Sequence, residues 1–508
     1  MPRWEINALF PVAYTSLKIS ELVKDSVLKT NPDQSLSIVY SGEVYKIDFD
    51  SLFQIPDTSI LQSFKAPFGG FPVNPGFTFY NQVQSTKYNL QGVELTEAIV
   101  RSGTIEVELH STFRGKTALT YQLPLATING NFFSISDTLP AAVAGSSSVI
   151  YKTYDITGYK LNLKGTNGNS FNTVVSSFKA IAVDTTMIYL NDSITVVNNF
   201  INVVPEFAKG YFGKAVIDVE PANTAVKKLS HIVGGTLDMK YFDLKLKIQN
   251  GVGVDIQFLL NEIKSQNFSA GSSVLLSSSV VGSSININRA AINSALNYPP
   301  IVNSEYVINL NNSNSNADEL IEIFPDSISA GVQITLNPLG NISNSNDFVY
   351  YGNGINVTLD AEIPLCFSAN NLILQDTLDV NFQPDSDATK KIIDGNLILD
   401  CYNGYPFEAK PQIFLLNQND VIYDSLITNN TIINTADLDA NFKSVGKKFS
   451  KILIPVNQEK IEKLKAAKKL MVKLFFSTAA QPNYVKIYSD YSVELKLVAD
   501  INYSVEND

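Results

Sequence analysis

The chain has 508 residues and a formal net charge of -11, with an isoelectric point near 4.9, and its length allows roughly three domains. Binding to nucleic acid requires clustered Lys and Arg side chains, so this dispersed acidic charge argues against a nucleic-acid partner. Charged residues make up only 17% of the chain, against roughly 25% in ordinary soluble domains. Asn, Ser, Thr and Gln must therefore supply much of the surface polarity, which is typical of exported β proteins.

The start of the chain lacks the charged segment and apolar core of a signal peptide. No apolar run reaches the roughly 18 residues of a membrane-spanning helix, so we expect no transmembrane segment. The chain is then either cytosolic or a mature protein whose leader has been removed. The low charge and the Asn/Ser-rich loops favour the second explanation, which predicts a periplasmic or outer-membrane-associated protein.

Two cysteines, Cys366 and Cys401, lie far apart in the sequence. Two cysteines in a chain of this length cannot form a disulfide scaffold. They either pair with each other or stay as buried free thiols. The spacing of a Cys-x-x-Cys metal site is missing.

Alternating apolar residues are the main structural signal. In the stretch Ser102–Pro124, apolar residues at 105, 107 and 109 alternate with polar ones at 106, 108 and 110, which predicts a half-buried strand. A related Gly-Thr segment follows at Gly235–Phe258, with a strand expected over 237–248, and a weaker copy runs from Asn353 to Pro364. Because short turns separate such segments throughout, we expect a mostly β chain of several antiparallel β-sandwich or tube-like units.

Three consecutive units are expected. They are an N-terminal β unit over 1–222 that includes an aromatic loop at 64–79, a second β unit with short helices over 223–384, and a C-terminal β-sandwich-like unit over 385–508. Short helices are expected near 17–23, 289–296, 318–324 and 457–469, from apolar spacing, capping residues and following prolines.

The aromatic loop holds Phe64, Phe68, Phe71, Phe77 and Phe79 among several glycines and prolines. No strand or helix period can bury these rings regularly, so the segment is expected to be irregular. The rings then either fold back as a plug over an open end of a sheet or are offered to a partner. We favour the first reading, and we single out the loop as the best candidate for a partner-binding surface.

Residues for catalysis are scarce. His110 and His231 are the only histidines, and no Gly-x-Ser-x-Gly turn is present. The acidic residues Asp385, Asp387 and Asp394 lack the glycine and the final glutamate of a calcium-binding EF-hand loop. Paired glycosidase carboxylates need no local motif and leave no sign here. We therefore expect no catalytic residue, no metal site and no cofactor.

Three short motifs carry a resemblance: Trp-x-x-x-Ala-Leu-x-Pro-Val-Ala at 4–13, Gly-Tyr-Phe-Gly at 210–213, and Asn-Gly-Tyr-Pro-Phe-Glu-Ala at 403–409. With these motifs the chain resembles β-rich cell-envelope proteins of Bacteroidetes-type bacteria. The resemblance implies export and a role as an accessory subunit of an outer-membrane complex, such as the plug that closes the type 9 secretion channel. The segments 92–124 and 235–263 are more loosely similar to late-embryogenesis-abundant-type β-sandwiches and to tubular lipid-binding (TULIP-like) folds.

The expected function is that of a non-enzymatic structural or accessory subunit that docks onto a larger outer-membrane protein complex. The alternative is a carrier that holds a lipid or another hydrophobic ligand in a β-tube groove. A glycan-active enzyme is a more distant alternative.

Overall fold

The computed structural model describes residues 3–18, 28–49, 57–221, 223–225, 232–380, 382, 390–427, 431–478 and 484–506. Strands dominate this part of the chain, and the helices in it are α2 (Glu319–Glu322) and α3 (Gln458–Ala466). The strand pairs within these ranges run antiparallel, as those between β7 and β14 and between β1 and β35 do. The mostly β fold with antiparallel sheets and few short helices is therefore confirmed.

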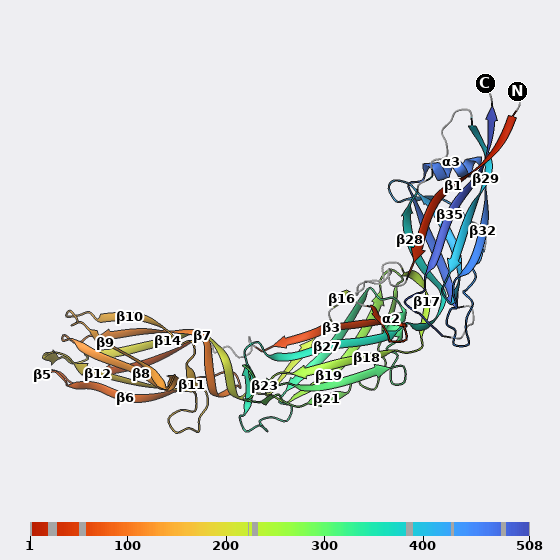
Figure 1. Cartoon of the computed structure of the whole chain (residues 1–508). Coiled ribbons are helices and arrows are strands. Elements are labelled where there is room, and N and C mark those ends of the chain that lie inside the picture. The colour runs from red at the N-terminus through yellow and green to blue at the C-terminus, as the bar shows by residue number, and fades with distance from the viewer. Residues whose placement is uncertain are drawn as a thin grey trace.

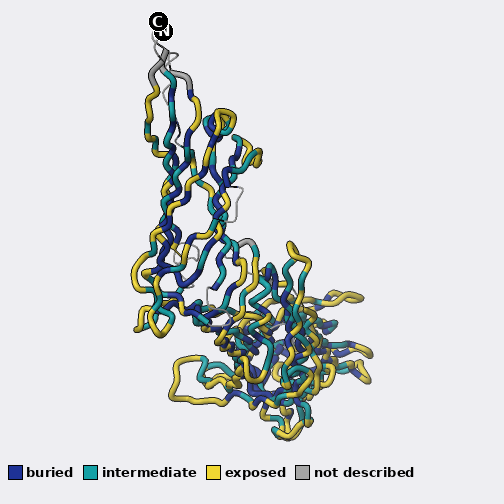
Figure 2. Tube along the Cα trace, turned by 90° about the vertical axis from the view of Figure 1, so that its right-hand side faces the viewer, coloured by how far each residue is buried: buried dark blue, intermediate teal, exposed yellow. Residues whose placement is uncertain are grey.

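Three lobes follow one another in a bent row, and both chain ends lie at the same end of it (Figure 1). We call them the terminal lobe, which holds both chain ends, the middle lobe and the distal lobe. In each lobe the strands alternate buried and exposed positions, while the connections between strands are mostly exposed (Figure 2). This alternation is what two packed sheets require, because successive side chains of a strand point to opposite faces.

The distal lobe is formed by one continuous stretch of chain, from residue 57 to residue 211. One layer has the strand order β10-β7-β14-β4 and the other the order β9-β8-β12-β6, while β11 bridges β7 and β8. The strands are β4 (Thr58–Lys65), β5 (Phe71–Val73), β6 (Thr78–Lys87), β7 (Glu94–Ser111), β8 (Thr117–Ile128), β9 (Asn131–Leu139), β10 (Ser148–Asp155), β11 (Lys160–Asn162), β12 (Thr173–Ala182), β13 (Thr186–Ile188) and β14 (Ser193–Tyr211).

The middle lobe packs a five-stranded sheet, in the order β2-β3-β27-β18-β24, against a sheet built on β15-β25-β19-β20. Its strands are β2 (Leu28–Thr30), β3 (Leu36–Asp48), β15 (Ala215–Val219), β16 (Thr224–Ala225), β18 (Asp243–Asn250), β19 (Ile256–Asn267), β20 (Ser272–Leu275), β21 (Ser284–Ile287), β22 (Ala291–Ile292), β23 (Ile301–Val302), β24 (Ser304–Asn311), β25 (Ser327–Leu336), β26 (Asp347–Tyr350) and β27 (Gly354–Pro364).

The terminal lobe packs the sheet β1-β35-β29-β32 against the sheet β17-β28-β33-β30-β31. Its strands are β1 (Arg3–Leu17), β17 (Ile232–Met239), β28 (Cys366–Asp379), β29 (Lys390–Asn403), β30 (Phe407–Leu416), β31 (Ile422–Ser425), β32 (Lys448–Asn457), β33 (Lys469–Thr478), β34 (Val485–Lys486) and β35 (Val493–Glu506).

The sheets join segments from both ends of the chain. β1 pairs with β35, and β3 pairs with β27. The chain therefore leaves the terminal lobe, crosses the middle lobe, forms the distal lobe and returns by the same route. The division into consecutive units 1–222, 223–384 and 385–508 stays a prediction, and these strand pairs cross its boundaries. Pairing between segments so far apart leaves no local mark in a sequence.

The alternating stretch after Ser102 forms the second half of β7, with Ile105, Val107 and Leu109 at most 4% exposed. Gly103 lies within this strand instead of opening it. It sits where the register with β14 shifts, and a Cβ atom there would lie 3.0 Å from the Cα atom of Val203. The glycine therefore allows a bulge inside one long strand.

The expected helices have mixed outcomes. Those near 318–324 and 457–469 are confirmed as the shorter α2 and α3. The helix expected over 289–296 is wrong, because Ala291 and Ile292 pair with β23 across the turn that contains the two prolines. The first helix was expected to include Leu17, which ends β1, and most of that segment lies outside the described residues.

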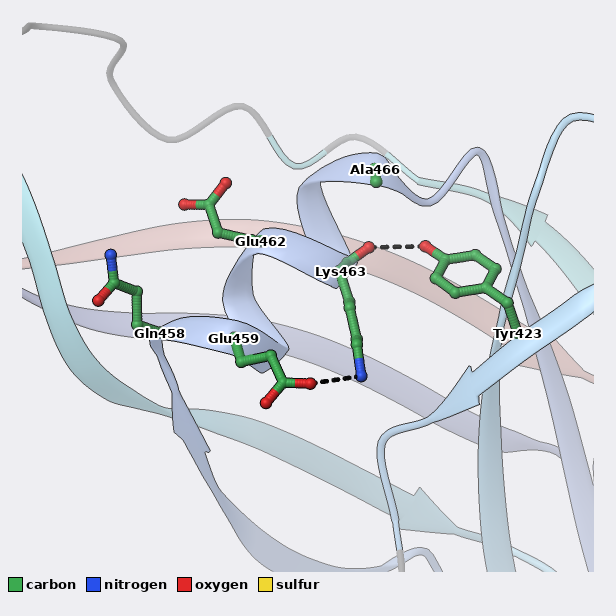
Figure 3. A pocket seen from close by; sticks show the side chains of 6 residues that line it. All are labelled: Tyr423, Gln458, Glu459, Glu462, Lys463 and Ala466. Atoms are coloured by element: carbon green, nitrogen blue, oxygen red, sulfur yellow. Dashed lines mark hydrogen bonds and ion pairs between the residues drawn. The ribbon is translucent and has the colours of Figure 1, made fainter.

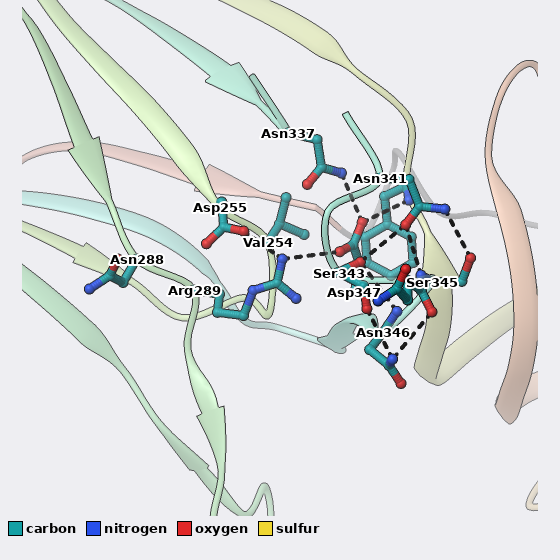
Figure 4. A network of polar contacts seen from close by, with 12 residues as sticks. Val254, Asp255, Asn288, Arg289, Asn337, Asn341, Ser343, Ser345, Asn346 and Asp347 are labelled. Atoms are coloured by element: carbon teal, nitrogen blue, oxygen red, sulfur yellow. Dashed lines mark hydrogen bonds and ion pairs between the residues drawn. The ribbon is translucent and has the colours of Figure 1, made fainter. Parts of the chain in front are cut away.

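A polar network surrounds Asp347 in the middle lobe, at its joint with the distal lobe (Figure 4). β26 pairs with the end of β14, and Asp347, the first residue of β26, is 0% exposed. Its Oδ2 atom accepts hydrogen bonds from Asn337 Nδ2 (2.8 Å) and from the Phe212 main-chain N (3.1 Å). Arg289 lies 3.5 Å from Asp347 and 2.6 Å from Asp255. The two lobes are therefore connected by the pairing of β26 with β14 and by the hydrogen bond from Phe212, while the ion pairs of Arg289 lie on the middle-lobe side of the joint.

Candidate binding surface at the tip of the distal lobe

Four connections meet at the free end of the distal lobe, which carries β5 and lies farthest from the termini (Figure 1). They are residues 66–77, 112–116, 140–147 and 183–192, and together we call them the distal tip. They meet because β4, β7, β9 and β12 all end here, whereas β6, β8, β10 and β14 begin here, as alternating antiparallel strands must. The joint with β26 lies at the opposite end of β14.

Main-chain hydrogen bonds hold the connections of the distal tip together. β5 and β13 form a two-stranded sheet that links 66–77 to 183–192. The Gly70 N–H donates to the Ile188 carbonyl (2.7 Å), and the Ala142 N–H donates to the Phe113 carbonyl (2.9 Å). Gly69 permits a close approach, since a Cβ atom there would lie 2.3 Å from the Leu190 main-chain nitrogen. The distal tip is therefore a packed structure with many of its amides satisfied internally.

The aromatic segment 64–79 is less irregular than the sequence predicts. Residues 64–65 belong to β4, residues 71–73 to β5 and residues 78–79 to β6. The expectation of a fully irregular loop is wrong because pairing of β5 with β13, more than a hundred residues away, organises its centre. This short Phe-Pro-Val segment is a strand only because it pairs with β13, so no local periodicity predicts it.

The five phenylalanines of this segment differ in exposure. Phe79 is buried, with its ring centroid 4.2 Å from that of Phe113. Phe64 and Phe71 are half-buried, the former against Tyr80. Phe68 and Phe77 are exposed. Their role in partner binding stays a prediction, and Phe68 and Phe77 are the two rings that a partner can reach directly.

Besides Phe68, which is 65% exposed, further apolar side chains of the distal tip are exposed. They come from two other connections and form, with Phe68 and Phe77, the exposed apolar set of the tip: Phe68, Phe77, Val143, Val183, Met187, Tyr189 and Leu190. Sequence reasoning missed the members outside 64–79. A run of small residues around Val143 and an apolar run at 187–190 were visible, but no local pattern placed them at the same end of the lobe as Phe68.

The charges of the distal tip are arranged unevenly. Its two acidic residues accept main-chain hydrogen bonds: Asp184 Oδ1 from Lys116 N (2.8 Å), and Asp192 Oδ2 from Tyr189 N (2.7 Å). Arg114 and Lys116 are exposed, and the Arg114 guanidinium lies 3.7 Å from the centroid of the Tyr189 ring. Lys65 is exposed at the end of β4. The fully exposed charged side chains here are therefore the cations, since Asp184 is half-buried and Asp192 is buried.

The residues weighed for catalysis and metal binding are dispersed. His110 lies on β7 and contacts Glu108, with 2.8 Å between Nε2 and Oε1. His231, Asp385 and Asp387 lie outside the described residues. Asp394 accepts a hydrogen bond from Asn502 Nδ2 (2.8 Å). Among the described residues, no group of three or more His, Cys, Asp or Glu side chains could hold a metal ion.

The two cysteines are free thiols in buried positions. Burial raises the pKa of both, and it raises that of Cys401 to about 12. Neither thiol is therefore activated as a nucleophile, because the reactive thiolate is disfavoured.

A shallow open depression lies beside α3 in the terminal lobe (Figure 3), lined by Tyr423, Gln458, Glu459, Glu462, Lys463 and Ala466. The Lys463 ammonium is 2.7 Å from Glu459, and the Tyr423 hydroxyl donates to the Lys463 carbonyl (2.6 Å). The nearby Asp424 carboxylate also contacts Lys463. The cation is therefore neutralised by its own neighbours, and the depression offers no converging unpaired group for a ligand.

Within the described ranges, no helix has the length and apolar character needed to cross a membrane.

No family model matches the chain, and no curated protein matches it. Among solved structures, a "putative secreted protein" from Parabacteroides distasonis ATCC 8503 is 12% identical, with a TM-score of 0.29, over 59% of this chain and 90% of that one. The top component of cowpea mosaic virus, a naturally occurring empty particle, is 9% identical, with a TM-score of 0.16, over 63% of this chain and 91% of that one. At such TM-scores neither likeness carries an argument about fold or function.

Proposed function

We propose that this protein is a non-enzymatic accessory subunit of the bacterial cell envelope that docks onto a larger outer-membrane complex through the distal tip. One observation carries the proposal: exposed apolar side chains from three connections gather at the end of the molecule farthest from both termini. Exposed apolar clusters of this kind mark interaction surfaces, since leaving them in water is unfavourable.

The lobed architecture supports the same role. The distal lobe is a continuous insertion, so it can be displayed without interrupting the sheets that hold the two termini together. The pairing of β26 with β14 and the hydrogen bond from the Phe212 main chain to Asp347 attach the lobe to its neighbour. Because the three lobes form a row, the distal tip can contact a partner that lies far from the terminal lobe (Figure 1).

Site-specific photo-crosslinking in the cells that naturally produce the protein tests this proposal. A crosslinking residue replaces Phe68, which is 65% exposed, and in a second variant it replaces Leu453 on β32, which is 60% exposed in the terminal lobe. We expect a discrete envelope-protein product from position 68 and none from position 453. Equal products from both positions, or no envelope-protein product from position 68, contradict docking through the tip.

The lipid-carrier alternative has a test of its own. Protein purified from its natural source is extracted with organic solvent and examined by mass spectrometry. A stoichiometric lipid would favour a carrier over a docking subunit, whereas we expect none.

A further inference from the structure

We propose that the distal tip recognises an anionic phospholipid surface, with Phe68, Val143 and Leu190 entering the headgroup region and with Lys65, Arg114 and Lys116 contacting the phosphates. This inference rests on the proposed function in one respect: it takes the distal tip as the docking surface. It adds the chemistry of what the tip contacts, namely the lipid surface around an outer-membrane complex.

The three most exposed apolar side chains of the distal tip lie on separate connections. Val143 is 76% exposed, Phe68 65% and Leu190 62%. Each lies between strand ends, on the outermost part of the lobe, and not along a strand face or in a groove. A partner protein would need a matching set of hollows for them. A lipid interface accommodates projecting apolar groups without such a match, and binding to it grows with the apolar area inserted.

Aromatic rings with a polar neighbour suit the boundary between headgroups and acyl chains. The Tyr189 ring, with the Arg114 guanidinium stacked on it, provides such a pair on the rim of the apolar set. Main-chain amides of the same connections already donate within the tip: Ala66 N to the Asp192 carbonyl (2.7 Å) and Gly76 N to the Ala182 carbonyl (2.8 Å). Fewer polar groups therefore lose water when the tip enters the interface.

The charges complement phosphate. Across the four connections and the adjoining Lys65, the charged residues are Lys65, Arg114, Lys116, Asp184 and Asp192. This gives a net charge of +1 (three cations, two anions) in a chain whose net charge is -11. Both aspartates accept main-chain N–H groups, and within the described residues neither Lys65 nor Lys116 forms an ion pair with a carboxylate. The cations are thus available to headgroups.

The electrostatic part of the affinity follows from the number of cations. Each Lys or Arg near an anionic membrane contributes about fivefold to binding, so three contribute on the order of a hundredfold. Binding should weaken in high salt, because exposed charges are screened beyond the roughly 10 Å Debye length at 0.1 M salt.

Vesicle sedimentation with the full chain tests the inference. One set of vesicles contains phosphatidylcholine alone, and the other contains phosphatidylcholine mixed with phosphatidylglycerol. We expect clear binding to the mixed vesicles, much weaker binding to phosphatidylcholine, and a loss of binding at high salt. The double variant Lys65→Gln/Lys116→Gln should weaken binding to the mixed vesicles by about 25-fold, and Phe68→Ser by about tenfold.

Matched controls come from the terminal lobe. Leu453→Ser removes an apolar group of similar exposure, and Lys451→Gln removes an exposed cation of β32. Both should bind mixed vesicles as the unmodified chain does, and all variants should keep its thermal unfolding midpoint. Absence of binding, equal binding to both vesicle types, or equal losses in the controls would overturn the inference.

The outcomes separate the two proposals. If position 68 crosslinks to an envelope protein while the chain does not bind mixed vesicles, the docking proposal is supported and the lipid inference fails. If mixed vesicles bind through the tip while no protein is crosslinked, the lipid inference stands and docking onto a protein complex fails.

Discussion

The joint between the middle and distal lobes provides the sharpest structural prediction. Asp347 is 0% exposed, and it accepts hydrogen bonds from Asn337 and from the Phe212 main chain while facing Arg289. In the variant Asp347→Asn, the new NH2 group must face either Arg289 or the two other donors. At least one donor then loses its partner, and the hydrogen bonds that remain are no longer to a charged group.

The expected cost is about 2 kcal/mol. Hydrogen bonds to a charged group contribute roughly 1.5–3 kcal/mol, and removal of a buried charge offsets part of the loss by relieving desolvation. A change of about 2 kcal/mol corresponds to roughly thirtyfold faster exchange of the amide hydrogens that are protected by local opening. The affected amides should be those of β26 and of the end of β14, which it pairs with.

Hydrogen–deuterium exchange with mass spectrometry is the suitable assay, because it resolves separate segments. Tryptophan fluorescence would not serve, since the single tryptophan, Trp4, lies on β1 in the terminal lobe. Asp255→Asn is the matched control: Asp255 contacts the same Arg289 but is partly exposed, so its loss should cost less than about 1 kcal/mol. Unchanged exchange at β26 in Asp347→Asn, or equal effects of both variants, would refute this account of the joint.

Three further predictions follow from buried groups. Burial raises the pKa of Glu322 to about 7, above the ordinary value of 4.5. The folded state therefore binds an extra proton between these pH values, and the free energy of unfolding should fall by about 1–2 kcal/mol, after allowance for solvent screening, as pH rises from about 4.5 to about 7. Urea unfolding curves at several pH values should show this fall for the unmodified chain and not for Glu322→Gln. Cys366 and Cys401 should react with a thiol reagent only on unfolding, and rapid labelling of the native chain would contradict their burial. The side-chain amide of Gln62 is buried without a hydrogen-bond partner among the described residues, so Gln62→Met should raise the unfolding midpoint by an amount equivalent to about 1 kcal/mol, and a lower midpoint would count against this reasoning.

The local sequence correctly predicted which side chains of a single strand are buried. The alternation at 105–110 correctly assigns three side chains to the interior, because a strand's period of two depends only on its own residues. The segment 289–296 shows that apolar spacing alone does not identify the secondary structure. Its apolar spacing fits a helix, yet two of its residues pair with β23, and a short apolar segment cannot by itself distinguish these outcomes.

The candidate surface was likewise only partly predictable from the sequence. The density of rings, glycines and prolines at 64–79 marked a segment unlike the rest of the chain, and Phe68 and Phe77 of that segment are exposed at the distal tip. Which rings face outward was not readable, because Phe79 is buried by contact with Phe113 on another connection. No local pattern groups the cations of the tip, because Lys65 ends β4 whereas Arg114 and Lys116 lie on the connection 112–116.

Composition and short-range periodicity were enough to predict antiparallel β sheets and to mark the unusual aromatic segment, because both are properties of neighbouring residues. The pairing of β1 with β35, the insertion of 57–211 as a lobe, and the position of Val143 and Leu190 at the same end of that lobe as Phe68 follow only from the folded arrangement. Strand pairing depends on the fit of side chains across distant segments and on the whole packed core, so no local pattern specifies which strands meet or which connections share an end.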